Sequence, residues 1–446
     1  MRKQLLAFPV AATLSAAVLS AQQATPVPLS LARAVAVAAD TAPAVRLAEL
    51  RASEAEQRVR ETRGALLPTL NAAVSEDRRT QNLETFGFSL PLPPGETLDP
   101  KIGPVDVFDA RLRASTPLFD PAGVVRVRAA RAAAEGTHAE AGTAAETAGQ
   151  RAALAYVTAQ RAAATVAARR EDVRLASELV TLAQAQLDRG VATALDLTRA
   201  RTQRATAQGL LSVAENQLDQ ARINLSRAMG VDPRVPLDAS DPLSASTAST
   251  AAPATEAAAV EAAIANRPEL RSAAAQQRAA QLSARAIRAE RLPRLELAAD
   301  YGLSGLTGHE TQSFPTYNLG LQVSVPVFDG FRREARQEQQ ELVAREAAVR
   351  AGDVQQQVEA EVRSALLDVA NGQDQQRIAA ERLQLANEEL SQSQERFANG
   401  LATNIEVINA QQNLVRARDA VIDAQAATAQ ARVNLARATG TTLNIR

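Results

Sequence analysis

Several residue types on which enzymes commonly rely are absent from this chain or scarce in it. The 446 residues include no Cys, no Trp and two His. The absence of Cys excludes disulfides and thiol nucleophiles, and it also excludes a Cys/His metal site. The net charge of −1 provides no basic field for nucleic acid. With no convergent set of acid, base and nucleophile, the sequence predicts a protein that is not an enzyme and that binds no cofactor, metal or nucleic acid.

Aromatic residues are scarce as well. They make up 3% of the chain, although the apolar fraction is 46%, much of it Ala. A globular enzyme core normally buries more large side chains than this composition supplies. We therefore expect long helices that pack closely.

The first residues have the layout of a secretory signal peptide. Basic residues precede an apolar stretch from Leu5 to Leu19, and small residues suited to cleavage follow near Ala21. The alternative, a membrane-spanning helix, is disfavoured by the short apolar stretch and by Pro9. We expect residues 1–21 to be removed on export.

The chain contains an internal duplication. Shifting the sequence by 210 positions superimposes 187–230 on 397–440 without a gap, so that "ARINLSRAMG" aligns with "ARVNLARATG". A duplication on this scale defines the architecture before any local motif does. We assign 22–230 to a first repeat, 231–256 to an equatorial linker and 257–446 to a second repeat.

Each repeat is predicted to contain a helix, two strands, a very long helix and a returning helix, so the fold is mainly α. The long helices extend from about 124 to 187 and from about 331 to 397, which is roughly 100 Å each. The returning helices, near 193–229 and 403–439, have about half that length.

The prolines place the remaining helices. A shift of 225 aligns Pro43 and Pro68 with Pro268 and Pro293. Helical segments of about 35 residues end near Pro68 and Pro293, and we expect them to lie beside the half of each long helix that the returning helix does not cover. Two short helices stacked end to end then match one long helix. Residues 91–104, "PLPPGETLDPKIGP", are predicted to form a loop specific to the first repeat.

One turn occurs twice, as "LDRGVATALDL" at 187–197 and "FANGLATNIEV" at 397–407. Gly190 and Gly400 suit the left-handed conformation that ends a helix. The residues with the spacing of a capping box at the start of the next helix are Thr193 with Asp196 and Thr403 with Glu406. The motif therefore predicts the tip of a helical hairpin in each repeat.

The helices beside these turns carry a heptad-like seam of alternating large and small residues. The pattern favours antiparallel helices in close contact, as in an ordinary coiled coil. In the second repeat the seam consists of Val407, Ala410, Leu414, Ala417, Val421, Ala424, Thr428, Ala431 and Leu435.

Four segments alternate between apolar and polar residues with the period of a β-strand: "LNAAVS", "ARLRASTPL", "LELAADYGL" and "YNLGLQVSVPV". At about ten residues, each has the length of a transmembrane strand. Residues in or beside these segments include most of the aromatics: Phe86, Phe88, Phe108, Phe119, Tyr301, Phe314, Tyr317, Phe328 and Phe331. A soluble sheet with one buried face explains this placement less well than a membrane does. Because an open edge is not stable in hydrocarbon, the sheet must be closed by strands of other copies.

At this point the chain resembles the TolC-like outer-membrane efflux proteins over nearly all of its mature length. The resemblance rests on "NRPEL" with "RLPRL", on "VPVFDG", on "FANGLATNIEV" and on the duplicated architecture. It implies a homotrimer in the outer membrane, with a twelve-stranded β-barrel and a long periplasmic α-helical barrel around one duct. It also implies docking to a periplasmic adaptor and an inner-membrane pump. A secreted structural coiled-coil protein without channel activity remains the alternative, and it predicts a soluble product.

The resemblance also implies roles for the two hairpin tips. Matching the family's periplasmic gate position by position selects Phe397, Ala402, Glu406, Asn409, Leu195 and Asp196. Phe397 has no hydroxyl and Ala402 no guanidinium, so the polar ties of better-known members cannot form there. Glu406 is expected either to form an acidic ring or only to complete its capping box. The residues expected to dock the adaptor are Gly190, Val191, Ala192, Thr193, Gly400, Leu401, Ala402 and Thr403.

Overall fold

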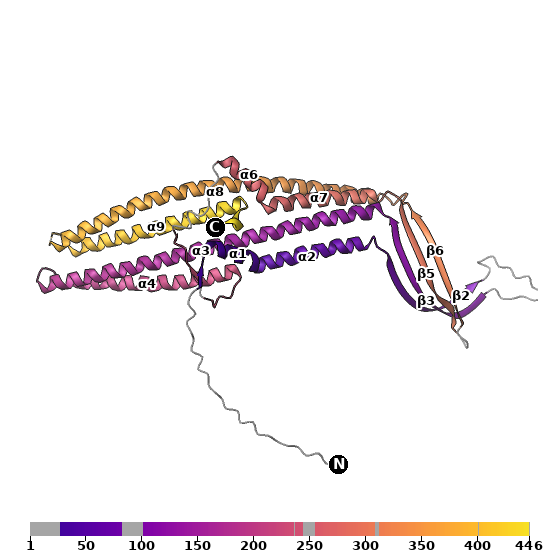
Figure 1. The fold of residues 1–446 in the computed structure, drawn as a ribbon, viewed down its shortest axis with the longest axis horizontal. Coiled ribbons are helices and arrows are strands. Elements are labelled where there is room, and N and C mark those ends of the chain that lie inside the picture. The colour runs from indigo at the N-terminus through magenta and orange to yellow at the C-terminus, as the bar shows by residue number, and fades with distance from the viewer. Residues whose placement is uncertain are drawn as a thin grey trace, which may run out of the picture.

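A computed structural model of the chain describes residues 27–82, 101–235, 237–243, 255–307, 312–399 and 401–445. The expected signal peptide and three residues discussed above, Phe86, Phe88 and Gly400, lie outside these ranges. Figure 1 shows a long helical rod with the sheet at one end and two hairpin tips at the other.

Two very long helices run the whole length of the rod. Helix α3 extends over Pro121–Asp188 and α8 over Arg332–Ala398, with 68 and 67 residues. Helix α3 begins cleanly because Asp120 accepts a hydrogen bond from the amide of Gly123 at 2.8 Å and Pro121 occupies the first turn. The predicted long helices are confirmed to within a few residues.

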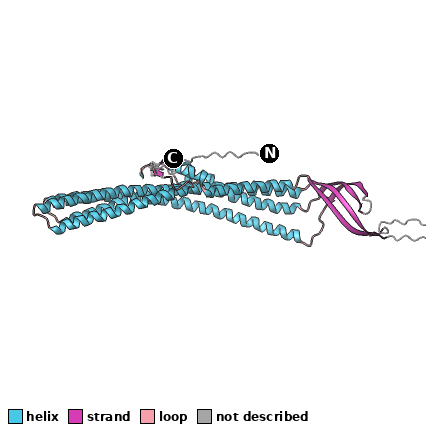
Figure 2. Ribbon diagram, turned by 90° about the horizontal axis from the view of Figure 1, so that it is seen from below, coloured by secondary structure: helices cyan, strands magenta, loops and turns pink. Residues whose placement is uncertain are grey.

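Shorter helices lie end to end beside the long ones. Helices α2 (Pro43–Gly64) and α4 (Ala194–Met229) both pack on α3, whereas α7 (Pro268–Ala289) and α9 (Asn404–Ala438) pack on α8. Figure 2 shows this two-part arrangement from below. The expected end-to-end stacking is confirmed.

Glycines form the joints between stacked helices. Gly230 ends α4 with φ of +72°, and a Cβ built on it would lie 2.8 Å from the carbonyl oxygen of Thr41. Gly440, with φ of +70°, meets the backbone of Asn266 in the same way. Each returning helix therefore ends directly against a proline-bounded break in the preceding helical segment.

The segments that end near Pro68 and Pro293 are not single helices, which corrects the expectation of two uninterrupted segments. A break before Pro43 separates α1 (Leu31–Thr41) from α2, and a break before Pro268 separates α6 (Glu256–Asn266) from α7. Proline lacks the amide hydrogen needed inside a helix and disfavours helical geometry in the residue before it, so each helix ends there.

The middle of the rod contains the largest side-chain core. Strand β1 (Val27–Leu29) pairs in parallel with β4 (Leu237–Ala239), which lies in the described part of the linker. Tyr156 of α3 is fully buried there, and its hydroxyl lies 2.8 Å from the carbonyl oxygen of Leu29 and 2.9 Å from Asp241. The short helix η2 (Thr442–Asn444) closes the same region near the C-terminus.

The sheet is a four-stranded antiparallel array in the order β2-β3-β5-β6. Its strands are β2 (Thr69–Asn82), β3 (Lys101–Phe119), β5 (Arg294–Thr307) and β6 (Gln312–Ser324). With 13 to 19 residues, they are longer than the ten predicted. Of the loop expected at 91–104, residues 91–100 lie outside the described ranges, and residues 101–104 belong to β3, which corrects that part of the prediction.

The register aligns the apolar face across all four strands. Tyr301 pairs with Leu112 on one side and with Tyr317 on the other, while the adjacent Asp300 pairs with Arg113 and Asn318. Since neighbours in a strand point to opposite faces, one face is apolar and the other polar. The apolar side chains are exposed, including Leu70, Val74, Leu112, Tyr301, Tyr317, Leu319, Leu321 and Val323. Only Val325 and Val327 of the predicted pattern lie beyond the end of β6.

Candidate functional site

The first hairpin tip forms as its sequence predicts. Gly190 has φ of +76°, and Thr193 is the N-cap of α4. The amide of Asp196 donates to the Thr193 hydroxyl at 3.3 Å, and the amide of Thr193 donates to the Asp196 carboxylate at 3.1 Å. Hydrogen bonds from the hydroxyl and then the amide of Thr193 lower the pKa of Asp196. This capping box is confirmed.

The second tip differs from the first, which corrects the prediction of two equal capping boxes. Thr403 occupies the N-cap of α9 but its side chain makes no capping hydrogen bond. The Glu406 carboxylate instead lies 3.5 Å from the guanidinium of Arg396, across the same hairpin. Glu406 therefore has an ion partner in place of its expected capping role.

The apex of each tip presents an exposed apolar side chain. Val191 is 67% exposed and Leu401 is 72% exposed. Thr193 and Thr403 are exposed beside them, while Ala192 and Ala402 are half-buried. These positions suit contact with another protein, and adaptor docking there remains a prediction.

Phe397 lies in an apolar core within the chain, and its role at the gate remains a prediction. It is 5% exposed. Its neighbours come from both hairpins, because α3, α4, α8 and α9 all contribute to the same apolar cluster near the tips. That cluster, the tip core, contains Leu179, Ala183, Leu197, Ala200, Ala386, Leu390, Phe397, Val407, Ala410, Leu414 and Ala417. Among the other gate candidates, Leu195 and Asn409 are exposed and Asp196 and Glu406 half-buried.

Two buried amides that the sequence did not single out connect the hairpins above this core. The side chain of Gln186 donates to the carbonyl oxygen of Phe397 at 3.1 Å. The side chain of Asn404 donates to the carbonyl oxygen of Asp196 at 2.8 Å. No periodicity reveals such bonds, because their acceptors are backbone atoms of the other repeat.

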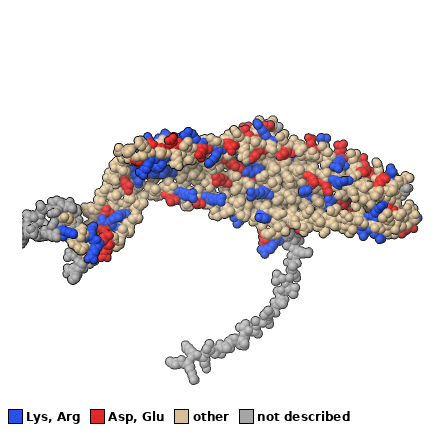
Figure 3. All heavy atoms as spheres, turned by 180° about the vertical axis from the view of Figure 1, so that it is seen from behind, with Lys and Arg blue, Asp and Glu red and all other residues tan. Residues whose placement is uncertain are grey.

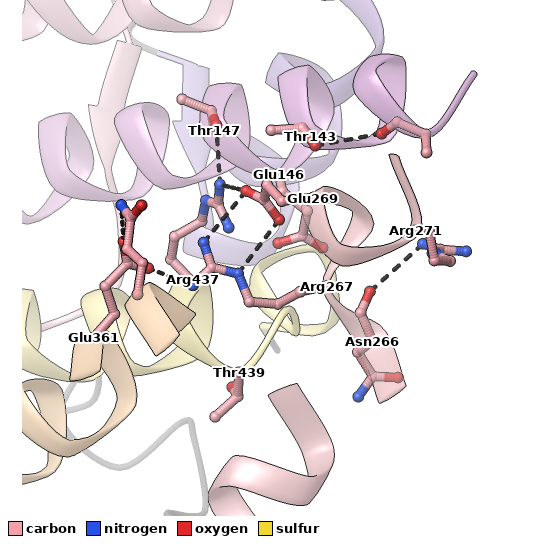
Figure 4. A network of polar contacts seen from close by, with 12 residues as sticks. Thr143, Glu146, Thr147, Asn266, Arg267, Glu269, Arg271, Glu361, Arg437 and Thr439 are labelled. Carbon is pink, nitrogen blue, oxygen red and sulfur yellow. Dashed lines mark hydrogen bonds and ion pairs between the residues drawn. The ribbon is translucent and has the colours of Figure 1, made fainter. Parts of the chain in front are cut away.

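A buried ionic network lies near the middle of the rod (Figure 4). Arg267 is 5% exposed and contacts Glu269 at 3.3 Å, and it also pairs with Glu361 of α8. Arg437 of α9 pairs with Glu269 from the other side. Burial raises the pKa of Glu269, but hydrogen bonds from Arg267 and Arg437 outweigh burial and hold that pKa below its usual value.

The polar face of the sheet carries one compact ionic cluster. Arg111 contacts Asp109 on its own strand at 2.5 Å and Asp300 on the neighbouring strand at 2.6 Å. Gly302 permits this arrangement, since a Cβ there would lie 2.4 Å from that of Arg111. A water-filled space on this side would therefore be lined by charges of both signs, with one more carboxylate than guanidinium in this cluster.

The sheet and the helical rod each have two unpaired edges, and the first-repeat elements lie at one edge and the second-repeat elements at the other in both. In the sheet the edges are β2 and β6. In the helical rod α2 and α4 lie on one side and α8 on the other, with α3, α7 and α9 between them. Exposed apolar side chains are found on both helical edges: Leu47, Leu50, Leu210, Val213 and Ile223 on one, and Leu342, Val349, Leu367, Ile378 and Leu385 on the other.

Charges of both signs are interspersed along the face of the rod seen in Figure 3. His138 lies 2.8 Å from Glu56 on an exposed part of the rod, and His309 is outside the described residues. Within the described ranges no group of three or more His, Asp or Glu residues is placed to hold a metal ion. Among the described helices, none has both the length and the apolar character needed to cross a bilayer.

The sequence model of a family described as Outer membrane efflux protein matches residues 34–231 and 259–441. The chain belongs to the outer membrane efflux protein family. The two matched ranges coincide closely with the two repeats, and membership places the protein in the outer membrane. The comparisons give no support to the alternative of a secreted structural coiled coil.

Members of the family with known roles are distant relatives. The chain is 27% identical over 282 residues to the pyoverdine export outer membrane protein OpmQ of Pseudomonas putida, a match that covers 60% of this chain and 56% of OpmQ. It is 26% identical over 292 residues to the outer membrane efflux protein BepC of Brucella suis, covering 64% of this chain and 61% of BepC. The chain thus matches little more than half the length of these relatives.

The whole fold matches a solved channel. The structure of CusC superimposes with a TM-score of 0.77 and 21% identity, and the match covers 99% of each chain. The duplicated arrangement of helices, strands and hairpin tips is therefore the fold of an outer-membrane channel protein.

Proposed function

We propose that this protein is the exit duct of a tripartite efflux or type I secretion system, a passive conduit gated at its periplasmic tips. The main support for this proposal is that the sheet and the helical rod have their unpaired edges on the same two sides of the chain, one formed by the first repeat and one by the second. Strand β6 of one copy is free to pair with β2 of the next, and α8 then lies against α2 and α4 of the same neighbour. Repeating such a head-to-tail contact closes a ring.

The faces of the sheet fit this ring. Exposed apolar side chains such as Leu319 and Tyr317 would face lipid, and the Arg111 cluster would face the lumen. Three copies would give a barrel of twelve strands, the number implied by the resemblance. The division into repeats 22–230 and 257–446, joined by the linker 231–256, belongs to the same proposal.

The partners in this proposal are a periplasmic adaptor and an inner-membrane pump. The exposed Val191 and Leu401 support the hairpin tips as the docking surface. Bulky substitutions at these two positions should abolish adaptor crosslinking and efflux while trimers stay intact. Normal efflux in both variants would remove the docking assignment.

The duct itself is tested with purified protein in detergent and in planar lipid bilayers. Native mass measurement should give a trimer, and single-channel recording should show discrete conductance steps. A soluble monomer, or a membrane-inserted trimer without conductance, would contradict the proposal.

A further inference from the structure

We propose that the end of the rod next to the sheet carries a surface that binds the headgroups of anionic phospholipids at the periplasmic side of the outer membrane. The inference rests on the proposed function, because that proposal sets the sheet in lipid and the rod in the periplasm. The surface, here called the basic collar, consists of five arginines from three neighbouring helices: Arg60, Arg63, Arg128, Arg131 and Arg285.

Two ion pairs define the face of the rod on which these arginines lie. His138 of α3 lies 2.8 Å from Glu56 of α2, and Arg278 of α7 lies 3.2 Å from Glu135 of α3. These four residues therefore form one row across the same face of the three helices.

The collar is the next row towards the sheet. Because seven residues make about two helical turns, side chains seven positions apart lie on the same face of a helix. Each of the four paired residues has an arginine seven positions nearer to the sheet, and Arg60 lies one turn from Glu56 on the same side. The matching positions are Glu56 with Arg63, Glu135 with Arg128, His138 with Arg131, and Arg278 with Arg285.

The collar lies close to the sheet. Helices α2 and α7 end at Gly64 and Ala289, where their chains enter the sheet, and α3 begins at Pro121, where its chain leaves the sheet. All five arginines are within about ten residues of these ends, or about 15 Å along the rod. At the same end of the sheet Leu321 and Val323 are exposed on the apolar face. Lipid tails that cover this face would bring their headgroups to the level of the collar.

The chain does not neutralise the charge of the collar. All five arginines are exposed, and within the described ranges none of them forms an ion pair. Arg126 lies about 200° around α3 from Arg128, on the other face of the rod. It pairs there with Asp120 and Glu290, at 3.4 Å each. Near the sheet, unpaired positive charge is therefore gathered on one face, although the whole chain has a net charge of −1.

This face is the outer one in the proposed ring. Along α3, Gly149 and Tyr156 follow Arg128 by multiples of seven positions. Gly149 lies against Thr442, and Tyr156 bonds to Leu29, so η2 and β1 pack on the face that carries the collar. These elements project from one side of the rod (Figure 2) and would obstruct the duct if they pointed inward.

Phosphate is the group that this surface suits. A guanidinium can donate two parallel N–H bonds to a phosphate, and basic side chains beside a membrane are attracted to anionic lipids. In a ring the collars of neighbouring copies would form one basic band at the level of the headgroups. Binding of this band to the headgroups would set the depth of the barrel in the membrane.

The experiment measures lipid preference in reconstituted trimers. Wild type and the triple variant Arg128→Gln, Arg131→Gln, Arg285→Gln are placed in phosphatidylcholine vesicles that contain a trace of spin-labelled phosphatidylglycerol or phosphatidylcholine. Wild type should immobilise the anionic label several-fold more strongly than the neutral one. The triple variant should show no preference, and added salt should weaken the preference of wild type by screening.

A matched control removes the same charge elsewhere. The variant Arg151→Gln, Arg189→Gln, Arg382→Gln loses three arginines that are likewise exposed and form no ion pair among the described residues, but that lie at the middle of the rod and towards its tips. This control should keep the lipid preference of wild type. An equal preference in wild type and in the collar variant would overturn the proposal.

Two further outcomes separate this proposal from others. If the collar variant kept its lipid preference but lost binding to purified peptidoglycan, the surface would belong to the cell wall and the lipid assignment would be wrong. The lipid measurement does not depend on conductance. A conducting trimer without lipid preference would reject the collar and keep the duct. A preference that the collar variant loses, in a protein that never conducts, would keep the collar and reject the duct.

Discussion

Glu269 lies between two guanidinium groups at the middle of the rod, and its charge is what holds them together. Because Arg267 and Arg437 depress its pKa in the folded state, the stabilisation is fully present above the unfolded pKa of about 4.5 and is lost as pH falls through the folded value. We predict that Glu269→Gln lowers stability by about 2 kcal/mol at pH 7. Thermal unfolding in detergent across pH 3–7 should show the two proteins converging at the acid end, and a constant difference would contradict the assignment.

At the second tip, the half-buried Glu406 and the exposed Arg396 form an ion pair whose partners should have opposite effects on ions. If three Glu406 carboxylates surround the aperture, they raise the local concentration of cations, and Arg396 partly neutralises them. We predict that Glu406→Gln reduces cation preference and divalent-ion block, while Arg396→Gln increases both. Reversal potentials in asymmetric salt provide the measurement. Identical values for wild type and both variants would place the constriction elsewhere.

At the scale of elements, the glycines at the joints allow two short helices to stack end to end along one long helix. Gly190 and Gly230 share a left-handed conformation, but only Gly230 is in contact, since Gly190 has open space around its Cβ position. Gly190→Ala should therefore cost about 1 kcal/mol for the backbone conformation alone. Gly230→Ala should cost clearly more, because the new methyl also meets Thr41 and Ala42. Equal losses in thermal unfolding would show that the joint contact contributes nothing.

The elements also show which features a sequence can reveal. Long helices, hairpin tips and the first capping box were predictable, because each depends on residues a few positions apart, such as Thr193 with Asp196. The second capping box was predicted wrongly. Glu406 can either cap the start of its own helix or pair with Arg396, and the local spacing does not show which interaction is more stable. The burial of Phe397 and the amide bonds of Gln186 and Asn404 depend on contacts over about 210 positions, which no local pattern encodes. The broken segments at Pro43 and Pro268 were readable from proline chemistry alone.

For the whole molecule, the two faces of the sheet make the membrane assignment testable by adjacent substitutions. Leu319 and Asn318 are neighbours in β6, both exposed, and they point to opposite faces. We predict that Leu319→Lys destabilises membrane insertion by about 2–4 kcal/mol, whereas Asn318→Lys is tolerated. The fraction of heat-stable trimer recovered from outer membranes measures this difference. Equal recovery of both variants would mean that the apolar face does not contact lipid.

The joints at Gly230 and Gly440 have a mechanical consequence. Among the described helices, only α3 and α8 continue as unbroken backbone at that level, while the shorter helices beside them meet end to end through non-covalent contacts. At this level α3 and α8 alone resist bending through continuous backbone, so the rod bends most easily at its middle. The ion pairs among Arg267, Glu269, Glu361 and Arg437 act as an elastic restraint at the second-repeat joint, with no ionic counterpart at Ala42 and Ala44 of the first. A sideways force on the hairpin tips will therefore tilt the part of the rod between the joints and the tips as one stiff unit. The joint at Gly230 will yield to this force more easily than the joint at Gly440.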